Sequence, residues 1–192
     1  EQKAEALHWF PMFRTWFSLC GLCKLPWNDI LPEDNKDTKE PAKVIKHLQW
    51  YADYFSAVTG RSSEPDDLII MSEAVYNFQR IFNLKMGFGR AEHDNLPYRA
   101  MGPVTELEYE SRAERYDTQL KDTHQIDISG KTTAEKTALL RQLRCEQYEK
   151  LKGAVYRRRG WTSDGIPTAE TVRRLGIDLA GVLETLEANG VQ

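Results

Sequence analysis

The chain has 192 residues, of which 41% are hydrophobic and 29% charged, and this length is enough for one hydrophobic core. Lys and Arg together number 26 and Asp and Glu 29, so the formal net charge is only -3. Such a small charge gives no strong positive field to hold a nucleic acid or an anionic membrane, and neither partner is expected. No apolar stretch matches the roughly 30 Å hydrocarbon layer of a bilayer, so we expect a soluble chain without a membrane span.

The start of the sequence and its cysteine content indicate what kind of chain this is and which cellular compartment it occupies. The sequence begins at Glu1 with neither an initiator Met nor a signal-peptide pattern, which favours a fragment, a processed chain or an excised domain. Cys20, Cys23 and Cys145 are too few and too unevenly placed for the disulfide framework of a small secreted domain. A reducing compartment is therefore expected.

Helical periodicity runs through most of the sequence, and no segment shows the alternation of a strand flanked by hairpin turns. An all-α fold with an irregular set of helices is therefore predicted. The first helix is expected over residues 3–19, with a kink or restart near Phe10 because Pro11 lacks an N–H group and clashes with the preceding turn. A loop rich in Pro, Asn and Asp is expected over residues 26–41, where Pro41 suits the first turn of the next helix.

Two further helices are predicted in the middle of the chain. The second is expected over residues 42–58, with one apolar stripe at three- and four-residue spacing, and ends at Gly60. The third covers residues 66–86 and ends at Gly87, and its apolar residues lie on more than one side. We therefore expect the third helix to be the central and most buried one.

The second half of the chain combines a long polar segment with more helices. Residues 102–131 are interpreted as an extended excursion with a weak helical pattern, and long excursions usually serve a partner or a site. Thr132 and Glu135 predict a capping box for a long fourth helix. Two short helices near residues 169–175 and 179–188 are expected to finish the chain.

The sharpest local motif is Cys20-Gly21-Leu22-Cys23, followed by Lys24, where an aromatic helix gives way to a loop. Glycine lets the backbone approach a bulky ligand closely, and a neighbouring cation favours the ionised thiol that binds metal. A thioredoxin-type site expects an α/β setting, and a four-Cys zinc site needs a second pair, so neither fits well. Two packed cysteines at a helix end are the structural alternative.

Other candidate groups are less specific. The four histidines share no metal-binding spacing on one helix face, so no zinc site is expected. Arg157, Arg158 and Arg159 end a helix and are interpreted as solvated charges that compensate its dipole, with contact to an anion or a cofactor phosphate as the alternative. A dense set of aromatic residues near the start could shield a cofactor from water, although such crowding is more often core. These are Trp9, Phe10, Phe13, Trp16, Phe17 and Trp27.

Three segments occur in order along the chain: residues 18–24 (SLCGLCK), residues 77–90 (NFQRIFNLKMGFGR) with their continuation to Arg99, and residues 156–177, which contain YRRRGW, DGIPT and LGI. The first resembles the second copy of the Asp-x-x-Gly-Leu-Cys motif of the aldehyde ferredoxin oxidoreductase family. The second resembles the Asn-Leu-x-Arg-x-Phe-Asn-x-Arg-x-Gly-Phe segment of these tungsten- and molybdenum-pterin enzymes. The third resembles their carboxy-terminal signature.

The resemblance implies a role for each residue of the first segment. Cys23 corresponds to the last cysteine ligand of a 4Fe-4S cluster, and Gly21 and Leu22 would present backbone to the pterin. Cys20 lies at a variable position of the motif and is expected to be a bystander. Ser18 replaces the Asp of the motif, so its hydroxyl can bond a pterin nitrogen only without charge assistance. The expected cofactor-binding residues are thus Ser18, Gly21, Leu22 and Lys24, with Cys23 as the metal ligand.

The same resemblance implies partners for the chain. A cubane cluster takes four thiolates, and this chain offers one or two at the right place. The other ligands, the other pterin motif and the catalytic acid/base residues would belong to a more amino-terminal, β-rich part of the same enzyme. Residues 1–192 would then form the C-terminal helical domain of a larger enzyme with a tungsten or molybdenum bis-pterin and a 4Fe-4S cluster, in an anaerobic cytoplasm.

The resemblance implies one of two reactions, and the first is favoured. The aromatic start and the long excursion resemble the catalytic subunit of class II, ATP-independent benzoyl-CoA reductase, in which low-potential electrons reduce an aromatic acyl-CoA. The second reaction is the oxidation of an aldehyde to a carboxylate with ferredoxin as acceptor. An electron-transfer subunit or ferredoxin would be the redox partner in these cases. A non-catalytic helical interaction module that has lost its cofactor is the alternative from a different class.

Overall fold

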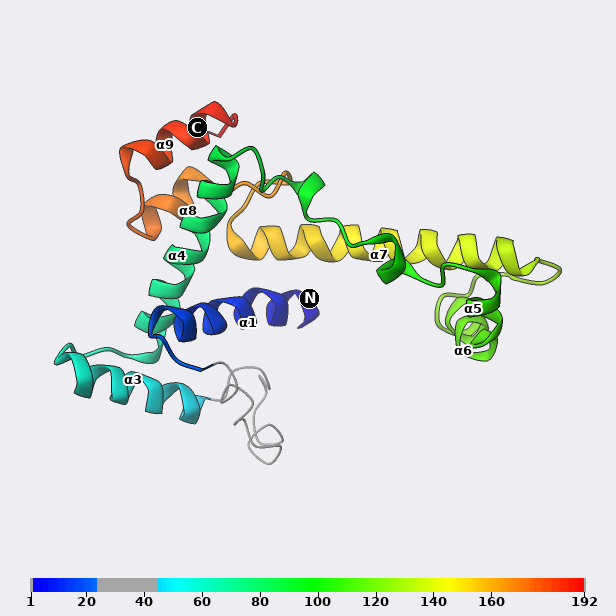
Figure 1. Cartoon of the computed structure of the whole chain (residues 1–192), viewed down its shortest axis with the longest axis horizontal. Coiled ribbons are helices and arrows are strands. Elements are labelled where there is room, and N and C mark those ends of the chain that lie inside the picture. The colour runs from blue at the N-terminus through cyan, green and yellow to red at the C-terminus, as the bar shows by residue number, and fades with distance from the viewer. Residues whose placement is uncertain (1, 24–44, 192) are drawn as a thin grey trace. The chain divides into compact units, whose positions relative to one another are not determined.

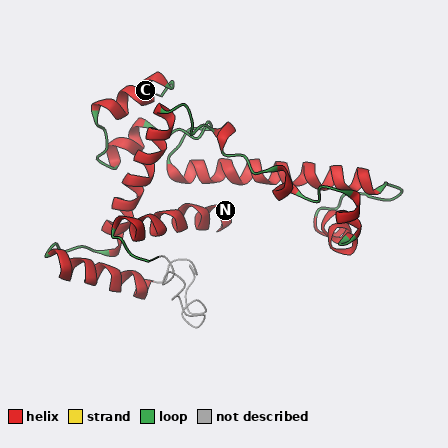
Figure 2. Ribbon diagram, in the orientation of Figure 1, coloured by secondary structure: helices red, strands yellow, loops and turns green. Residues whose placement is uncertain are grey.

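The computed structural model describes residues 2–23 and 45–191 (Figure 1). These residues form helices and no β-strand, which confirms the predicted all-α fold (Figure 2). The chain divides into two compact units: unit 1 comprises the residues up to 93 and those from 154 onward, and unit 2 comprises residues 94–153. None of the helices in the described ranges combines the length and the apolar character that crossing a bilayer requires.

Helix α1 (Gln2–Leu19) matches the first predicted helix, but it continues through Pro11 without a restart. Proline has no N–H group, so Pro11 cannot donate the helical hydrogen bond to the carbonyl of Leu7. That carbonyl accepts a hydrogen bond of 3.1 Å from the guanidinium of Arg159, at the end of another helix. A contact from a distant part of unit 1 thus replaces the bond that proline removes.

Helices α3 (Ile45–Thr59) and α4 (Pro65–Lys85) agree with the second and third predicted helices. The loop predicted over residues 26–41 and the predicted start of the second helix lie outside the described residues. Helix α4 begins with proline, whose missing donor costs nothing at this position. The carboxylate of Asp67 accepts a 2.9 Å hydrogen bond from the backbone N–H of Glu64, so a reciprocal cap fixes where the helix begins.

The first hydrophobic cluster of unit 1 lies where α1 and α3 pack against one end of α4 (Figure 1). The ring centre of Tyr51 lies 5.2 Å from that of Trp16 and 5.1 Å from that of Phe17, both edge to face. Such pairs stabilise a core beyond the area that they bury. Trp9, Trp16 and Phe17 therefore belong to the core, while Trp27 lies outside the described residues. The buried members of the cluster are Trp9, Trp16, Phe17, Leu48, Ala52 and Leu68.

The second cluster lies at the other end of α4, beside α8 (Ala169–Arg174) and α9 (Ala180–Ala188), which match the two short predicted helices (Figure 1). Helix α4 contributes to both clusters and so occupies the central position predicted for it. Its expected burial on several sides is not found, because Phe78 and Phe82 are exposed. The buried members of this cluster are Ile81, Leu84, Ile166, Val172, Val182 and Leu186.

Unit 2 contains the segment interpreted from sequence as an extended excursion, residues 102–131. Within it, α5 (Glu106–Glu110), α6 (Ala113–Thr118) and a π-helix (Gln119–Thr123) precede the long helix α7 (Thr133–Arg159). The weak helical pattern thus corresponds to several short helices that share a hydrophobic cluster with α7. The buried members of that cluster are Tyr109, Tyr116, Leu120, Ile128 and Leu140.

The capping box predicted for α7 is confirmed. The Thr132 hydroxyl accepts a 3.3 Å hydrogen bond from the backbone N–H of Glu135, and the Glu135 carboxylate accepts a 2.7 Å bond from the backbone N–H of Thr132. Gly160, with a φ of 67°, follows the last helical residue. The last turns of α7 belong to unit 1 and bring the arginine triplet into it.

Candidate functional site

The end of α1 carries the residues predicted to bind a cofactor. The backbone N–H of Leu22 donates to the carbonyl of Phe17 at 2.9 Å, and that of Gly21 donates to the carbonyl of Ser18 at 3.3 Å. These two bonds, with Gly21 at a φ of 67°, form a Schellman motif, which ends a helix with one left-handed residue. This backbone conformation costs a residue with a side chain roughly 1–2 kcal/mol. Glycine is therefore favoured here by local structure, independently of any pterin contact.

The described side chains around this turn are exposed. Cys20 and Cys23 form no disulfide bond, and both residues are exposed. Leu22 is 42% exposed, and the Ser18 hydroxyl donates only to a backbone carbonyl one turn earlier, at 3.4 Å. Lys24, the remaining predicted cofactor contact, lies outside the described residues. The predicted site is thus an exposed turn rather than a closed pocket.

Cys20 is not prepared to act as a thiolate. Partial burial of its thiol raises the pKa of Cys20 above its usual range. This cysteine therefore stays protonated at neutral pH. Within residues 2–23 and 45–191, no group of three or more His, Cys, Asp or Glu side chains is placed to hold a metal ion. The described residues therefore contain no such metal-binding group, and the turn exposes two free cysteines.

A second concave site lies in unit 1, where the other two segments of the resemblance meet. It is a cleft of about 630 Å³. Beside it, the indole N–H of Trp161 donates to the Asn77 side chain at 2.7 Å, and the Asn77 amide donates to the Glu73 carbonyl at 2.8 Å. Asn77 and Trp161 are 84 positions apart, so only the tertiary fold joins them. The lining of the cleft includes His8, Glu73, Arg157, Arg158, Trp161 and Arg174.

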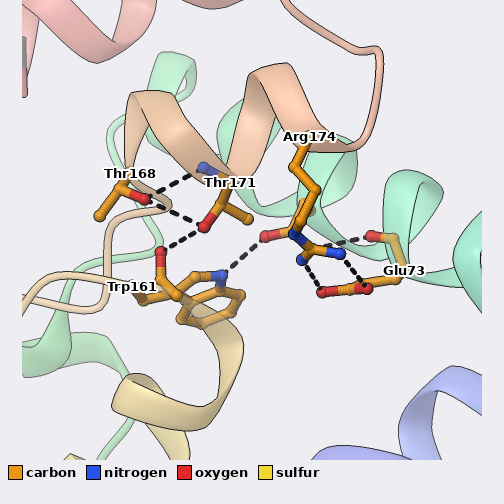
Figure 3. A network of polar contacts seen from close by, with 7 residues as sticks. Glu73, Trp161, Thr168, Thr171 and Arg174 are labelled. Carbon is orange, nitrogen blue, oxygen red and sulfur yellow. Dashed lines mark hydrogen bonds and ion pairs between the residues drawn. The ribbon is translucent and has the colours of Figure 1, made fainter.

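A network of polar contacts holds the wall of this cleft (Figure 3). The guanidinium of Arg174 binds both carboxylate oxygens of Glu73, at 2.5 and 3.1 Å. The hydroxyl of Thr171 donates to the carbonyl of Gly160 at 2.8 Å and lies 3.0 Å from the hydroxyl of Thr168, which caps α8. Side chains from α4 and α8 and the backbone after α7 are thereby held in one arrangement.

Two glycines of the third segment make this close packing possible. A Cβ atom on Gly160 would lie 2.1 Å from the hydroxyl oxygen of Thr171, and one on Gly165 would lie 2.6 Å from Nη2 of Arg80. Arg80 donates to the Gly165 carbonyl at 3.0 Å, and its guanidinium lies 4.8 Å from the centre of the Trp161 ring. The second and third segments therefore supply packing partners for each other.

His8 also lines the cleft, and the sequence did not single it out for this site. Burial lowers the pKa of its imidazole despite the opposing charge of Glu73, so the ring is neutral at pH 7. Its Nδ1 atom is buried and has no hydrogen-bond partner among the described residues. Because His8 and the arginines of the cleft lie at opposite ends of the sequence, no local pattern could have grouped them.

The arginine triplet has a more structural role than the sequence indicated. Arg158 forms an ion pair with Glu5. The Arg159 guanidinium lies 4.8 Å from the ring centre of Tyr76 and 4.9 Å from that of Trp161, in addition to its bond with the backbone of α1. The interpretation of the triplet as solvated charges is therefore wrong for Arg159, which packs against two aromatic rings.

The described residues thus form an all-α domain with an exposed Cys-x-x-Cys turn at the end of α1. A family model described as aldehyde ferredoxin oxidoreductase, domains 2 & 3, matches residues 1–177. The chain therefore belongs to the aldehyde ferredoxin oxidoreductase family, and it is a domain of the tungsten-pterin oxidoreductase type. Comparison with curated proteins and with solved structures found no match. The resemblance inferred from the three segments is thus confirmed at the level of the family.

Proposed function

We propose that this chain is the helical, cofactor-binding part of a tungsten- or molybdenum-pterin oxidoreductase, in which Cys23 is a thiolate ligand of a 4Fe-4S cluster. The observation that carries the proposal is the turn at the end of α1, where Gly21 ends the helix and the Cys23 thiol is exposed. Membership of the family supports this choice of cofactors. When bound, the cluster and the metal-pterin supply the electron transfer and the redox chemistry.

The described residues can supply only part of the ligands that such a cluster needs. A 4Fe-4S cluster takes four cysteine thiolates, whereas no three possible ligands lie together within residues 2–23 and 45–191. We assign the other ligands, the second pterin motif and the catalytic groups to an amino-terminal part of the same enzyme. The family description supports this assignment, because it covers domains 2 and 3 of these enzymes. Residues 1–192 would then enclose the cofactors from one side, and the amino-terminal part would enclose them from the other.

The other residues of the turn would hold and shield the cofactor. Gly21 and Leu22 present backbone groups at the point where the helical hydrogen bonds end. The Leu22 side chain, 42% exposed, offers apolar surface that excludes water from a ligand placed against it. The Ser18 hydroxyl is a neutral hydrogen-bonding group. Lys24 completes the proposed set from outside the described residues.

Replacing each of the two exposed cysteines tests the ligand assignment in the intact enzyme, purified without oxygen. Cys23→Ala is expected to lower the iron content and the visible charge-transfer absorption, because a thiolate ligand is lost. Cys20→Ala is the matched control, three positions away and also exposed, and is expected to keep both. Equal iron content in the two variants would show that Cys23 is not a ligand.

For the reaction, we propose low-potential reduction of an aromatic acyl-CoA, with aldehyde oxidation to a carboxylate as the second candidate. Trp9 and Trp16, which suggested a wall for an aromatic group, are buried in the core, so they are not available to line a substrate pocket. An assay of the intact enzyme separates the two reactions. Reduction of benzoyl-CoA by a low-potential dye without aldehyde-dependent dye reduction supports the first proposal, and the reverse result supports the second.

Metal analysis of the same preparation tests the non-enzymatic alternative. A pterin oxidoreductase contains tungsten or molybdenum together with iron, whereas a helical interaction module contains none of them. A folded, full-length product without these metals after anaerobic purification would therefore rule out the enzymatic proposal.

A further inference from the structure

Unit 2 contains a pocket of about 390 Å³ whose lining is dominated by arginine. Four guanidinium groups, from Arg99, Arg112, Arg115 and Arg144, line it together with a single carboxylate, from Glu108. Arginine stays protonated throughout the pH range in which proteins fold. The lining therefore has an excess of three positive charges, although the chain as a whole has a net charge of -3.

Three of the four guanidinium groups are not neutralised by a carboxylate in the described part of the chain. Arg112 and Arg115 are exposed, and no ion pair or hydrogen bond joins their side chains to another described residue. Arg144 donates to the neutral side chain of Gln119 at 3.0 Å, and its guanidinium lies 5.4 Å from the ring centre of Tyr116. The mutual repulsion of these three cations is relieved when an anion enters the pocket.

The one carboxylate of the lining is already engaged. Glu108 accepts a 2.7 Å hydrogen bond from the backbone N–H of Val104 and forms an ion pair with Arg99. These two contacts hold the pKa of Glu108 below its usual range, so the carboxylate stays ionised and fixed on them. It is therefore not available to neutralise the other three arginines.

The wall of the pocket is held by a further arginine of α7. Arg141 donates to the carbonyl of Pro103 at 2.7 Å and to that of Tyr98 at 2.6 Å. Its guanidinium also lies 3.5 Å from the ring centre of Tyr98. A Cβ atom on Gly102 would lie 3.6 Å from Nη1 of Arg144, so the backbone passes close to that guanidinium. The segment that faces the cations is thus fixed before any ligand binds.

We propose that this pocket binds the phosphate group of a small molecule, with Arg112, Arg115 and Arg144 as its cationic contacts. The two parallel N–H groups of a planar guanidinium match two oxygens of a phosphate group. The negative charge of a phosphate group can also balance several arginines. The volume of about 390 Å³ lies in the range of small-molecule sites, roughly 300–1,000 Å³. The proposal concerns unit 2 alone, so it stands or falls separately from the ligand role of Cys23.

Calorimetric titration of the full chain with inorganic pyrophosphate, at constant ionic strength, tests the proposal. Replacing both unpaired arginines, Arg112→Gln with Arg115→Gln, is expected to raise Kd by on the order of tenfold or more, because two charge-assisted contacts are lost. The matched control is Arg61→Gln with Arg173→Gln, which removes two exposed arginines from unit 1 and leaves Kd within about twofold. Equal weakening by both pairs, or no binding by the unmodified chain, would overturn the proposal.

Two further titrations distinguish a phosphate ligand from a carboxylate-rich partner and from a purely ionic attraction. An acidic peptide of glutamates that binds more tightly than pyrophosphate and displaces it would overturn the proposal in favour of a protein partner. Arg112→Lys with Arg115→Lys keeps both positive charges but removes the planar guanidinium groups, and an intermediate Kd is expected. If the Gln pair alters the far-UV circular dichroism spectrum, the Lys pair decides: Kd equal to that of the unmodified chain would then contradict the proposed contacts.

Discussion

The contacts inside unit 1 and those inside unit 2 join residues at very different separations along the chain. In unit 1, the buried hydrogen bond between Trp161 and Asn77 joins residues 84 positions apart. In unit 2, the Tyr109 hydroxyl bonds Asp117 only 8 positions away, and Lys136 binds the same carboxylate from a distance of 19 positions. Unit 1 therefore depends on bringing the two ends of the described chain together, whereas the contacts of unit 2 span shorter separations, such as the 43 positions between Arg141 and Tyr98.

The tryptophans make this difference measurable. All five tryptophans of the sequence lie outside residues 94–153. Tryptophan fluorescence therefore follows the unfolding of unit 1, while far-UV circular dichroism follows the helices of both units. A substitution in one unit is expected to move mainly its own signal, because distant sites without shared partners act independently.

The largest effect is expected for Gly160→Ala. The new methyl group would lie 2.1 Å from the Thr171 hydroxyl oxygen, and the backbone has a φ of 67°. Overpacking and the left-handed backbone together predict a loss of about 4 kcal/mol from the free energy of unfolding of unit 1, measured by fluorescence in denaturant. Gly176→Ala is the control, because Gly176 has a φ of 65° with no atom within 4 Å of its Cβ position. Similar losses for the two variants would contradict the packing at Gly160.

The next effect is expected for Asn77→Ala. Asn77 is 1% exposed, and its removal leaves the indole N–H of Trp161 buried without an acceptor. The unsatisfied donor and the cavity predict a loss of about 3 kcal/mol, again in the fluorescence signal. Gln79→Ala changes an exposed amide on the same helix and should cost less than about 0.5 kcal/mol. A cost for Asn77→Ala close to that of Gln79→Ala would mean that the buried bond does not join the two ends of unit 1.

A smaller effect, confined to unit 2, is expected for Tyr109→Phe. The substitution removes a 2.7 Å hydrogen bond to a partly exposed carboxylate while keeping the buried ring. A loss of about 1 kcal/mol is expected in the protection of the α5 and α6 amides from hydrogen exchange. The midpoint of the fluorescence transition should stay in place. A shift of that midpoint as large as the change in exchange would argue against local stabilisation of unit 2.

The carboxylate of Asp117 should make unit 2 sensitive to acid. Burial opposes its ionisation, but hydrogen bonds from Tyr109 and Lys136 outweigh this and hold the pKa of Asp117 below its usual range. A depressed carboxyl pKa contributes stability above the unfolded value, near roughly pH 4, and this stability is lost as the pH falls through the folded value. The exchange protection of α6 should therefore fall below about pH 4 in the unmodified chain and less steeply in Asp117→Asn. Parallel profiles for the two chains would contradict this assignment.

The smallest effect concerns the bond that compensates for Pro11. In the unmodified chain, the Leu7 carbonyl accepts its hydrogen bond from Arg159. In Pro11→Ala, the new backbone N–H can serve that carbonyl, so Arg159→Gln should cost about 0.5 kcal/mol less in this background than in the unmodified chain. A double-mutant cycle followed by fluorescence measures the difference. Strict additivity of the two changes would show that the guanidinium does not replace the missing bond.

Much of the helical layout could be predicted from the sequence because its signals are local. Glycines with positive φ follow α3, α4 and α7, and the cap at Thr132 and Glu135 has the expected bonds. The continuity of α1 through Pro11 could not be predicted, because the group that replaces the lost bond lies 152 positions away. The helices within residues 102–131 were also hard to predict, since short helices with one cluster leave only a weak periodic pattern.

The candidate sites were predictable only where their residues are neighbours in sequence. The turn that contains Gly21 and Cys23 is a single motif, so its position could be recognised from consecutive residues. The cleft beside His8 and the arginine pocket of unit 2 are assembled from separate helices and segments. A chain with a net charge of -3 also gives no compositional sign of a local excess of arginine.

The ligand role of Cys23 is tested most directly by a structure of the intact enzyme, purified without oxygen and containing this chain. We predict that Sγ of Cys23 is bonded to an iron atom of a 4Fe-4S cluster, with the remaining ligands supplied by another part of the enzyme. A Cys23 side chain that packs among protein neighbours, away from every inorganic centre, would contradict that role.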